Sequence, residues 1–365
     1  GAGIAAHRRL DCECNLCGNQ ETFLQTTLLL MATPKVQYLD NLRVTATLAV
    51  LLIHSAANVL LSFGKTPDSA WWFANLYNGG FRYAVPIFVM LSGALLLPRE
   101  EEMDSFFKKS FQRIIVPFLF YNSVFAIFNW QVRYGGRSMG FDWVFKQYFE
   151  GASYHFWYIY MIVGVYLFIP IIGSWVRQAK ESHLQFFLGM WLVTILFDNP
   201  HFPGLSLPIK LPYFTGYLGY LVLGYYVAQH DFSRVFAWIL FLVGTLWTME
   251  GTYLQSIEDG KFYGLLYANF SPSVVLSTAG LFMLFKSYEG TIPGTVAMRD
   301  WISSHSYGVY LVHIIVLFYL VKIKIYGGMW HPSIGIPLTA FICLLISSTI
   351  VWMLRRIPFG KYIAG

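Results

Sequence analysis

Two ionisable side chains inside one apolar segment offer the clearest chemistry in this sequence. Arg43 and His54 lie eleven residues apart within residues 38–54, most of which are apolar. Eleven residues of α-helix make about three turns, so both side chains would share one face about 16 Å apart. A buried imidazole can act as a general base, and a guanidinium can bind an anion. The pair therefore suits group transfer from an anionic, activated donor to a hydroxyl.

Three further polar residues fall on the same predicted helix face, namely Asp40, Thr47 and Asn58. Asp40 precedes Arg43 by one turn, which is the spacing of an intrahelical ion pair. A polar stripe along a membrane-crossing helix has to face protein or a water-filled cavity, because hydrocarbon solvates it poorly. We therefore predict a catalytic site along this stripe, with Asp40 as the partner of Arg43. The alternatives are a structural histidine and an arginine that reaches the lipid headgroups.

The composition predicts a multi-pass membrane protein, and we expect it to lie in the cell (inner or cytoplasmic) membrane. Of 365 residues, 56% are hydrophobic and 12% are charged, whereas about a quarter of a soluble domain is charged. Aromatic residues reach 19%, as expected where Trp and Tyr line both interfaces of a lipid bilayer. The net charge of +6 is scattered over short segments without a basic stripe, so no nucleic-acid partner is expected.

Apolar runs separated by Pro, Gly and charged residues predict an all-α protein with about ten transmembrane helices. If residue 31 lies inside, 16 of the 25 Lys and Arg residues lie on the inner side and 9 on the outer side. That bias predicts that both termini are cytoplasmic. The predicted spans are 39–62, 81–97, 113–131, 154–173, 184–198, 212–229, 235–253, 273–289, 303–324 and 335–354.

The domain organisation predicted from the sequence is simple. Residues 1–33 are expected to be a non-native or disordered N-terminal extension, because Met31 begins a run that resembles a natural start just before the first span. Residues 34–365 are expected to form a single membrane domain. We find no repeat at a fixed period in the sequence, which disfavours a transporter built from inverted repeats.

Four cationic residues outside the first span are candidate donor-binding residues. Lys108, Lys109 and Arg113 precede the third predicted span, and Arg82 opens the second from the outside. Clustered cations at a membrane face can bind the phosphates of a cytosolic substrate. They can equally serve only to set topology, and Arg82 can cap a helix or reach a cavity beside His54.

Five residues are candidates for the acceptor side of the site. Two are intramembrane ionisable groups, which are functional candidates by default, and three lie near the outer ends of spans. For each of them, anchoring or structural pairing is the alternative. No metal site is expected, and the sequence contains no Gly-x-Ser-x-Gly, His-Glu-x-x-His or P-loop motif. The five residues are Asn58, His155, Trp157, Glu250 and His313.

Six motifs, in order along the chain, resemble those of the acyltransferase-3 family of integral-membrane acyltransferases. The first is the Arg-x10-His pair Arg43 and His54, and the last is a Ser-x-Gly-x-Tyr-x-x-His element that ends at His313. Many members carry Arg-x-Arg before the third helix, whereas this chain has Lys108, Lys109 and Arg113. The compact form is similar to the branch that O-acetylates surface polysaccharides, including enterobacterial common antigen. The six motifs lie in residues 38–54, 85–93, 107–117, 155–158, 217–225 and 306–313.

The resemblance implies acyl transfer from acetyl-CoA, or another acyl-CoA, to a hydroxyl of a carbohydrate or glycolipid. The acyl-CoA would be a substrate, and no bound cofactor is implied. His54 would act as a general base, or it would form a covalent acyl-histidine. A transporter or flippase for a small anion or glycolipid is the alternative function.

Overall fold

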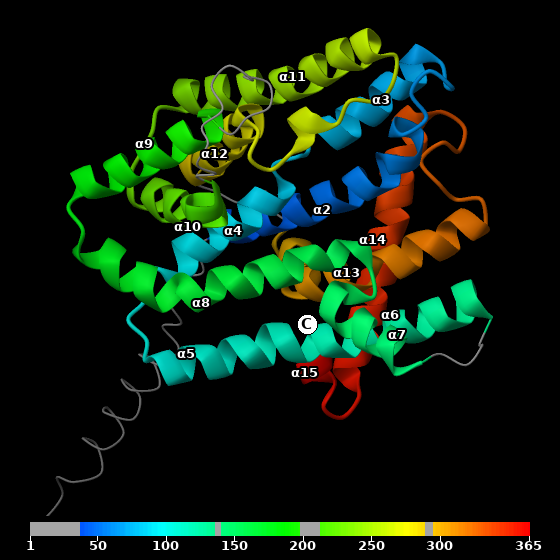
Figure 1. Cartoon of the computed structure of the whole chain (residues 1–365), viewed down its shortest axis with the longest axis horizontal. Coiled ribbons are helices and arrows are strands. Elements are labelled where there is room, and N and C mark those ends of the chain that lie inside the picture. Colours follow the sequence, from blue (N-terminus) through cyan, green and yellow to red (C-terminus); the bar gives the residue numbers. More distant parts are fainter. Residues whose placement is uncertain (1–36, 136–139, 198–211, 289–294) are drawn as a thin grey trace, which may run out of the picture. The chain divides into compact units, whose positions relative to one another are not determined.

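A computed structural model describes residues 37–135, 140–197, 212–288 and 295–365. Within those ranges every regular element is a helix (Figure 1), and the predicted extension 1–33 lies outside them. The longer helices are α2 (Gln37–Leu60), α3 (Asp68–Gly79), α4 (Ala84–Leu96), α5 (Met103–Ser110), α6 (Val116–Tyr134), α8 (Trp157–Gln178), α9 (Glu181–Phe197), α10 (Pro212–Gln229), α11 (Arg234–Asp259), α12 (Pro272–Ser287), α13 (Val296–Lys322) and α14 (Pro332–Arg356). Shorter elements are α7 (Phe141–Lys146), α15 (Gly360–Ile363), π-helical turns at Phe111–Ile115 and Gln147–Gly151, and 3-10 turns at Tyr154–Phe156 and Leu265–Tyr267.

The all-helical membrane fold predicted from the sequence is confirmed. In the part of the chain that the structure describes, eight helical segments are long and apolar enough to cross a bilayer. Two more of the ten predicted spans correspond to α9, a shorter apolar helix of 17 residues, and to α10, which is kinked at Gly216. The eight segments are Gln37–Leu60, Asp68–Leu96, Met103–Val132, Tyr154–Gln178, Arg234–Asp259, Leu265–Ser287, Val296–Lys322 and Pro332–Arg356.

The second span begins earlier than the sequence predicted and is broken near its middle. Helices α3 and α4 make one 29-residue segment, Asp68–Leu96, where we expected a span only from residue 81. The break follows Gly79 and Gly80, which weaken a helix, and precedes Pro86. Pro86 has no N–H to donate to the carbonyl of Arg82 four residues before it. Arg82 therefore lies at a break inside the segment rather than at its outer end.

Helices α2 and α13 run parallel and in register. The Arg43 side chain contacts Ser303, and the His54 ring lies 5.1 Å from the ring of His313, between centroids. His54 follows Arg43 by eleven residues, and His313 follows Ser303 by ten, so both helices advance in the same direction. Two points of contact on each helix therefore fix both its direction and its register.

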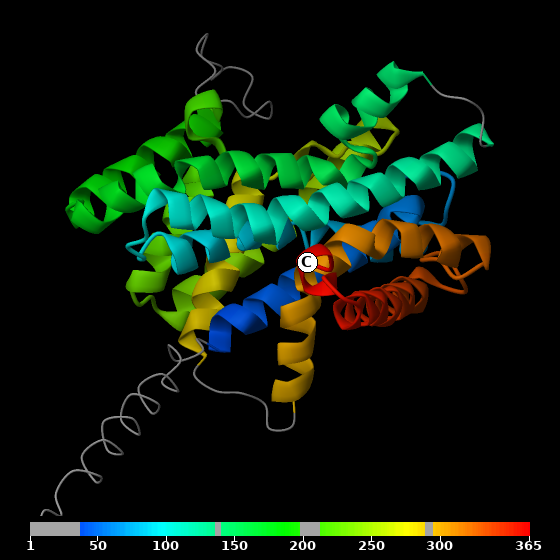
Figure 2. The same cartoon turned by 90° about the horizontal axis from the view of Figure 1, so that it is seen from below.

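Helix α6 and helix α8 lie alongside each other in both views (Figures 1 and 2). Their facing rings are in contact, because Phe118 of α6 lies 5.3 Å from both Phe156 and Tyr160, between ring centroids. Phe156 is the last residue of the 3-10 turn that leads into α8. This packing fixes the 3-10 turn before α8, in which Tyr154 and His155 lie.

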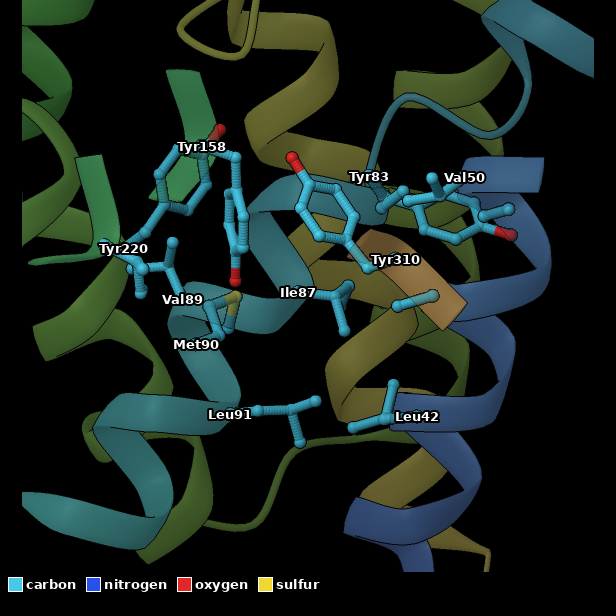
Figure 3. Packing of buried hydrophobic residues seen from close by; sticks show 14 of the residues in the cluster. Leu42, Val50, Tyr83, Ile87, Val89, Met90, Leu91, Tyr158, Tyr220 and Tyr310 are labelled. Atoms are coloured by element: carbon cyan, nitrogen blue, oxygen red, sulfur yellow. The ribbon is translucent and has the colours of Figure 1, made fainter. Parts of the chain in front are cut away.

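Helix α4 is buried in the apolar core. Figure 3 shows Ile87 and Leu91 of α4 on the side of Leu42 of α2, while Met90 lies on the side of Tyr220 of α10. Ile87 and Met90 are completely buried. Because α4 packs against α2 on one side and α10 on the other, these contacts also position the break that precedes it, where Arg82 lies.

The contact between α4 and α10 requires glycine on both helices. A Cβ on Gly93 would lie 1.8 Å from the carbonyl oxygen of Leu221, and one on Gly224 would lie 2.1 Å from that of Met90. Both glycines belong to motifs noted in the sequence, residues 85–93 and 217–225. These two motifs therefore meet and allow a close backbone approach.

We expect Gly93→Ala to destabilise the protein, because its methyl group would push α4 and α10 apart. Overpacking of this kind costs about 1–3 kcal/mol, and thermal unfolding of the purified protein would measure it. Gly164→Ala in α8 is the matched control, since nothing lies within 4 Å of a Cβ there. Equal unfolding temperatures for the two variants would contradict the close packing.

Candidate active site

One end of the α2–α13 pair carries a hydrogen-bonded group of three side chains. Arg43 Nη1 donates to Asp40 Oδ1 at 2.8 Å and contacts Ser303 Oγ at 3.1 Å. Ser303 Oγ donates to the same Asp40 oxygen at 2.7 Å. Asp40 is buried, while the Arg43 side chain keeps 29% of its surface exposed. The guanidinium is therefore oriented by α13 and still accessible to an anion.

The other end carries a histidine cluster, defined as His54, His155 and His313. The ring of His313 lies 5.1 Å from that of His54 and 5.3 Å from that of His155, between centroids. The three residues come from α2, from the 3-10 turn before α8, and from α13. Residues separated by more than 250 positions thus meet at one place within the membrane-spanning part of the fold.

Hydrogen bonds determine the tautomer of His313. Its Nδ1 lies 2.6 Å from the carbonyl oxygen of Tyr310, so Nδ1 carries the hydrogen and Nε2 carries the lone pair in the neutral ring. His313 Nε2 and His155 Nε2 are both buried without a hydrogen-bond partner among the described residues. Buried polar atoms without a hydrogen-bond partner are uncommon in a folded interior. Two of them in neighbouring rings indicate a place where a substrate group can bond.

His155 is held from two sides. Its Nδ1 lies 2.8 Å from Ser153 Oγ, and the Tyr310 hydroxyl donates to its main-chain carbonyl. The side chain is buried with 2% exposed. The position of His155 therefore depends on α13 as well as on its own turn.

Tyr154 connects His54 to the exposed surface. The Tyr154 hydroxyl lies 3.1 Å from His54 Nδ1, and the tyrosine itself is 67% exposed. A hydroxyl can accept a hydrogen bond from Nδ1–H, and in that tautomer Nε2 of His54 holds the lone pair that a general base needs. Tyr154 is thus placed to orient the His54 ring.

Arg82 lies at the helix break, close enough to His54 for the two groups to interact electrostatically. Its Nη2 donates to the side-chain oxygen of Asn78, and its guanidinium carbon lies 4.2 Å above the centre of the Tyr267 ring. Asn78 in turn donates to the main-chain carbonyl of Ile53 at 2.8 Å. Arg82 is therefore tied through Asn78 to the residue before His54.

The basic residues before the third span lie on a helix that continues into α6. Lys109 pairs with Glu101, and hydrogen bonds from Lys109 and Ser105 lower the pKa of the Glu101 carboxyl, so that it stays ionised. Lys108 and Arg113 are exposed, and neither forms an ion pair with a described carboxylate. Of the three predicted donor-binding residues here, Lys109 therefore already has an anionic partner.

Arg113 lies in a π-helical turn, Phe111–Ile115, that precedes Pro117. The proline lacks the N–H that would bond the carbonyl of Arg113. The neighbouring carbonyl of Ile114 accepts from the Tyr307 hydroxyl at 2.8 Å. Arg113 and Arg43 both interact electrostatically with the hydroxyl of Tyr166. Arg113, at the start of the third span, and Arg43, in the first span, thus both lie near Tyr166.

Three predicted acceptor-side residues are not part of the histidine cluster. Asn58 and Glu250 are exposed, and Trp157 is 45% exposed with its ring 6.4 Å from that of Tyr217, between centroids. Their roles stay predictions. Within the described ranges no group of three or more His, Cys, Asp or Glu side chains is placed to hold a metal ion.

The sequence analysis missed several residues that complete the site, chiefly Ser303, Tyr310 and Tyr154. Ser303 and Tyr310 belong to a polar stripe on α13 with the three- and four-residue spacing of one helix face. The reasoning applied to residues 40–58 would have found it. Tyr154 had no such signal, because it lies in an aromatic run at a span end, which is typical of a membrane interface. The stripe consists of Arg299, Ser303, Ser306, Tyr310 and His313.

The family model of an acyltransferase domain matches residues 36–355. The match contains Arg43, His54, His155 and His313. This chain belongs to the acyltransferase-3 family. The family predicted from the six motifs is confirmed, and the protein is a membrane-bound acyltransferase; the polysaccharide O-acetyltransferase branch stays a prediction.

A curated protein with a similar sequence supports membership of the acyltransferase-3 family. It is the protein of Bacillus subtilis (strain 168) named "Putative membrane-bound acyltransferase YfiQ", which is 20% identical over 356 residues. The alignment covers 91% of this chain and 94% of that protein. No solved structure matches the chain significantly.

We expect Tyr310→Phe to destabilise the protein and lower its acyltransferase activity. The change leaves the buried carbonyl of His155 without its hydroxyl donor, and an unsatisfied buried group costs about 1–3 kcal/mol. Thermal unfolding measures the first effect, and turnover per folded protein measures the second. Tyr319→Phe is the control, because Tyr319 is on the same helix and 51% exposed. If the two variants behaved alike, Tyr310 would not hold His155.

Proposed function

We propose that this acyltransferase moves an acyl group, most simply acetyl, from cytosolic acyl-CoA to a hydroxyl of a cell-surface or lipid-linked carbohydrate. The observation that carries this proposal is the parallel packing of α2 and α13. It puts an accessible guanidinium at one end of a polar track and the histidine cluster at the other. About 16 Å of helix separates Arg43 from His54, which an extended pantetheine arm can cover.

In the proposed reaction His54 Nε2 removes the proton of the acceptor hydroxyl as its oxygen attacks the thioester carbonyl. The tetrahedral adduct collapses, the carbon–sulfur bond breaks, and the CoA thiolate takes a proton from the imidazolium. The products are an O-acyl ester and free CoA. The Tyr154 contact at Nδ1 leaves the lone pair on Nε2, which suits a general base and a nucleophile equally, so a covalent acyl-histidine is the alternative route.

The donor phosphates are proposed to bind near Arg43, Lys108 and Arg113. Support comes from the partial exposure of Arg43 and the exposure of Lys108 and Arg113, and from Tyr166, which interacts electrostatically with both Arg43 and Arg113. Lys109 contributes less, since Glu101 neutralises it. Asp40 and Ser303 orient Arg43 and need not touch the donor.

The acceptor is proposed to approach from the extracytoplasmic side of the cell membrane, with both termini in the cytoplasm. Tyr154 and Trp157 are exposed aromatic residues beside the histidine cluster, and aromatic side chains pack well against sugar rings. Asn58 and Glu250 are exposed polar residues that can hydrogen-bond sugar hydroxyls. CoA would then stay on the cytoplasmic side throughout.

We expect His54→Gln to abolish acyl transfer in protein that still folds. A general base contributes about 10²–10⁴ in rate, and the glutamine side chain cannot take up the proton. The measurement follows label from radioactive acetyl-CoA into a glycolipid extract, using purified protein in nanodiscs. His331→Gln is the control, because His331 caps α14 away from the cluster.

Retention of wild-type turnover by the His54 variant would remove His54 from the reaction. If the wild-type protein transferred no label but moved anions or glycolipids across a vesicle membrane, the transporter alternative would replace this proposal. A stable acylated wild-type protein after incubation with labelled acetyl-CoA alone would favour the covalent route.

We expect Lys146→Cys to react with an impermeant thiol reagent added outside intact cells, and Lys180→Cys to react only after permeabilisation. Both lysines are exposed, and the predicted topology puts them on opposite sides of the membrane. Cys12, Cys14, Cys17 and Cys343 are first replaced by serine, so that only the introduced thiol can react. The reverse labelling pattern would put Arg43 outside, away from cytosolic acyl-CoA.

A further inference from the structure

The described part of the chain gives Arg82 no carboxylate partner, although Arg82 lies inside a segment long enough to cross the membrane. Arg43, Arg177 and Arg299 each pair with a carboxylate. Arg82 instead contacts the amide of Asn78 and the face of the Tyr267 ring. Its Nε is buried and has no hydrogen-bond partner in the described ranges.

The guanidinium is held rigidly by two chains of contacts. On one side Asn78, itself 2% exposed, bonds both Arg82 and the carbonyl of Ile53. On the other side the Tyr267 hydroxyl donates to Asn75, whose amide donates to the carbonyl of Met249 at 3.0 Å. These contacts tie Arg82 to α2 and α11 and keep it beside His54. Such a group cannot turn away to the headgroups.

A positive charge kept in this way is energetically costly. Arg82 as a whole is half-buried, while its Nε is buried. Placing a charge in an apolar span without a counter-ion is unfavourable, and arginine stays protonated under ordinary conditions. The neutral amide and the ring offset only part of that cost. The unpartnered Nε–H, together with the charge, therefore marks a site for a negative charge that arrives with a ligand.

We propose that Arg82 binds the acyl carbonyl oxygen of the donor and stabilises the oxyanion that forms when the acceptor attacks. This inference rests on the proposed acyl-transfer function. The carbonyl π electrons move to oxygen as the new carbon–oxygen bond forms, and they return when the carbon–sulfur bond breaks. Arg82 donates hydrogen bonds throughout and transfers no proton, because His54 takes the proton of the acceptor.

The position of Arg82 favours an oxyanion over a CoA phosphate. Arg82 is tied through Asn78 to the residue before His54, whereas Arg43 and Arg113 share the neighbourhood of Tyr166. A general base and an oxyanion donor act on atoms bonded to the same reacting carbon, so both have to lie close to it. Fixed donors at such a site need no reorganisation during the reaction, which is why their removal costs rate more than binding.

The first test compares Arg82→Gln with the wild type for acetyl transfer and for acetyl-CoA binding. We expect kcat to fall about 10²–10³-fold, with a much smaller change in the affinity for acetyl-CoA. Asn78→Asp is a second variant, since a carboxylate there still accepts from the guanidinium and neutralises its charge, although it loses the bond from the Asn78 amide to the carbonyl of Ile53. It should also lower kcat. A large loss of acetyl-CoA affinity without a loss of kcat would overturn the proposal in favour of phosphate binding.

The second test measures binding of two donor analogues, acetonyl-CoA, which keeps the carbonyl oxygen, and S-ethyl-CoA, which lacks it. The wild type should bind the first about 10-fold more tightly, as for one hydrogen bond to a charged group. Arg82→Gln should bind both equally. A merely structural role for Arg82 would weaken both analogues alike and would leave their ratio unchanged, which would overturn the proposal.

Arg234→Gln is the matched control for both tests. Arg234 also lies over an aromatic ring, that of Tyr288, and donates to the carbonyl of Ser287. It should retain both kcat and the analogue ratio. An inactive wild-type protein would count against the acyl-transfer function itself, whereas an active wild type with an unaffected Arg82 variant would count against this inference alone.

Discussion

The fold and the site both depend on the requirement that polar groups inside apolar spans find partners on other helices. Arg43 and Asp40 of α2 meet Ser303 of α13, and one end of the pair is thereby fixed. His54 meets His313 at the other end. Because both contacts occur between the same two helices, they fix register as well as proximity. A slip of one residue would rotate every polar group about 100° towards lipid or the apolar core.

The second constraint is the close approach of backbones that contain glycine. Gly93 and Gly224 let α4 and α10 touch, and α4 carries the break at which Arg82 lies. Membrane helices gain little from apolar burial alone, because lipid is as apolar as their side chains, so close packing and hydrogen bonds hold them together. The same packing that stabilises the bundle therefore places a charged group beside the proposed base.

The site has separate polar regions with different electrostatic character. Around Tyr166 the guanidinium of Arg43 is accessible, as a phosphate-bearing donor requires. In the histidine cluster the unpartnered Nε2 atoms of His155 and His313 are buried. Electrostatic interactions are stronger in such a water-poor interior than at the surface. A donor whose phosphates bind near Arg43 can thus react at the histidine cluster, as the proposed function requires.

The sequence by itself determined the membrane setting, the helical class, the family motifs and the pair Arg43 and His54, because hydropathy and helical periodicity are local properties. It also identified His155 and His313 as candidates, but not their convergence on His54. That convergence, the partners Ser303 and Tyr154, and the position of Arg82 at a broken helix were decided by the tertiary structure. The physical reason is that periodicity gives the face on which a residue lies, whereas the identity of the opposing helix depends on packing among segments hundreds of residues apart.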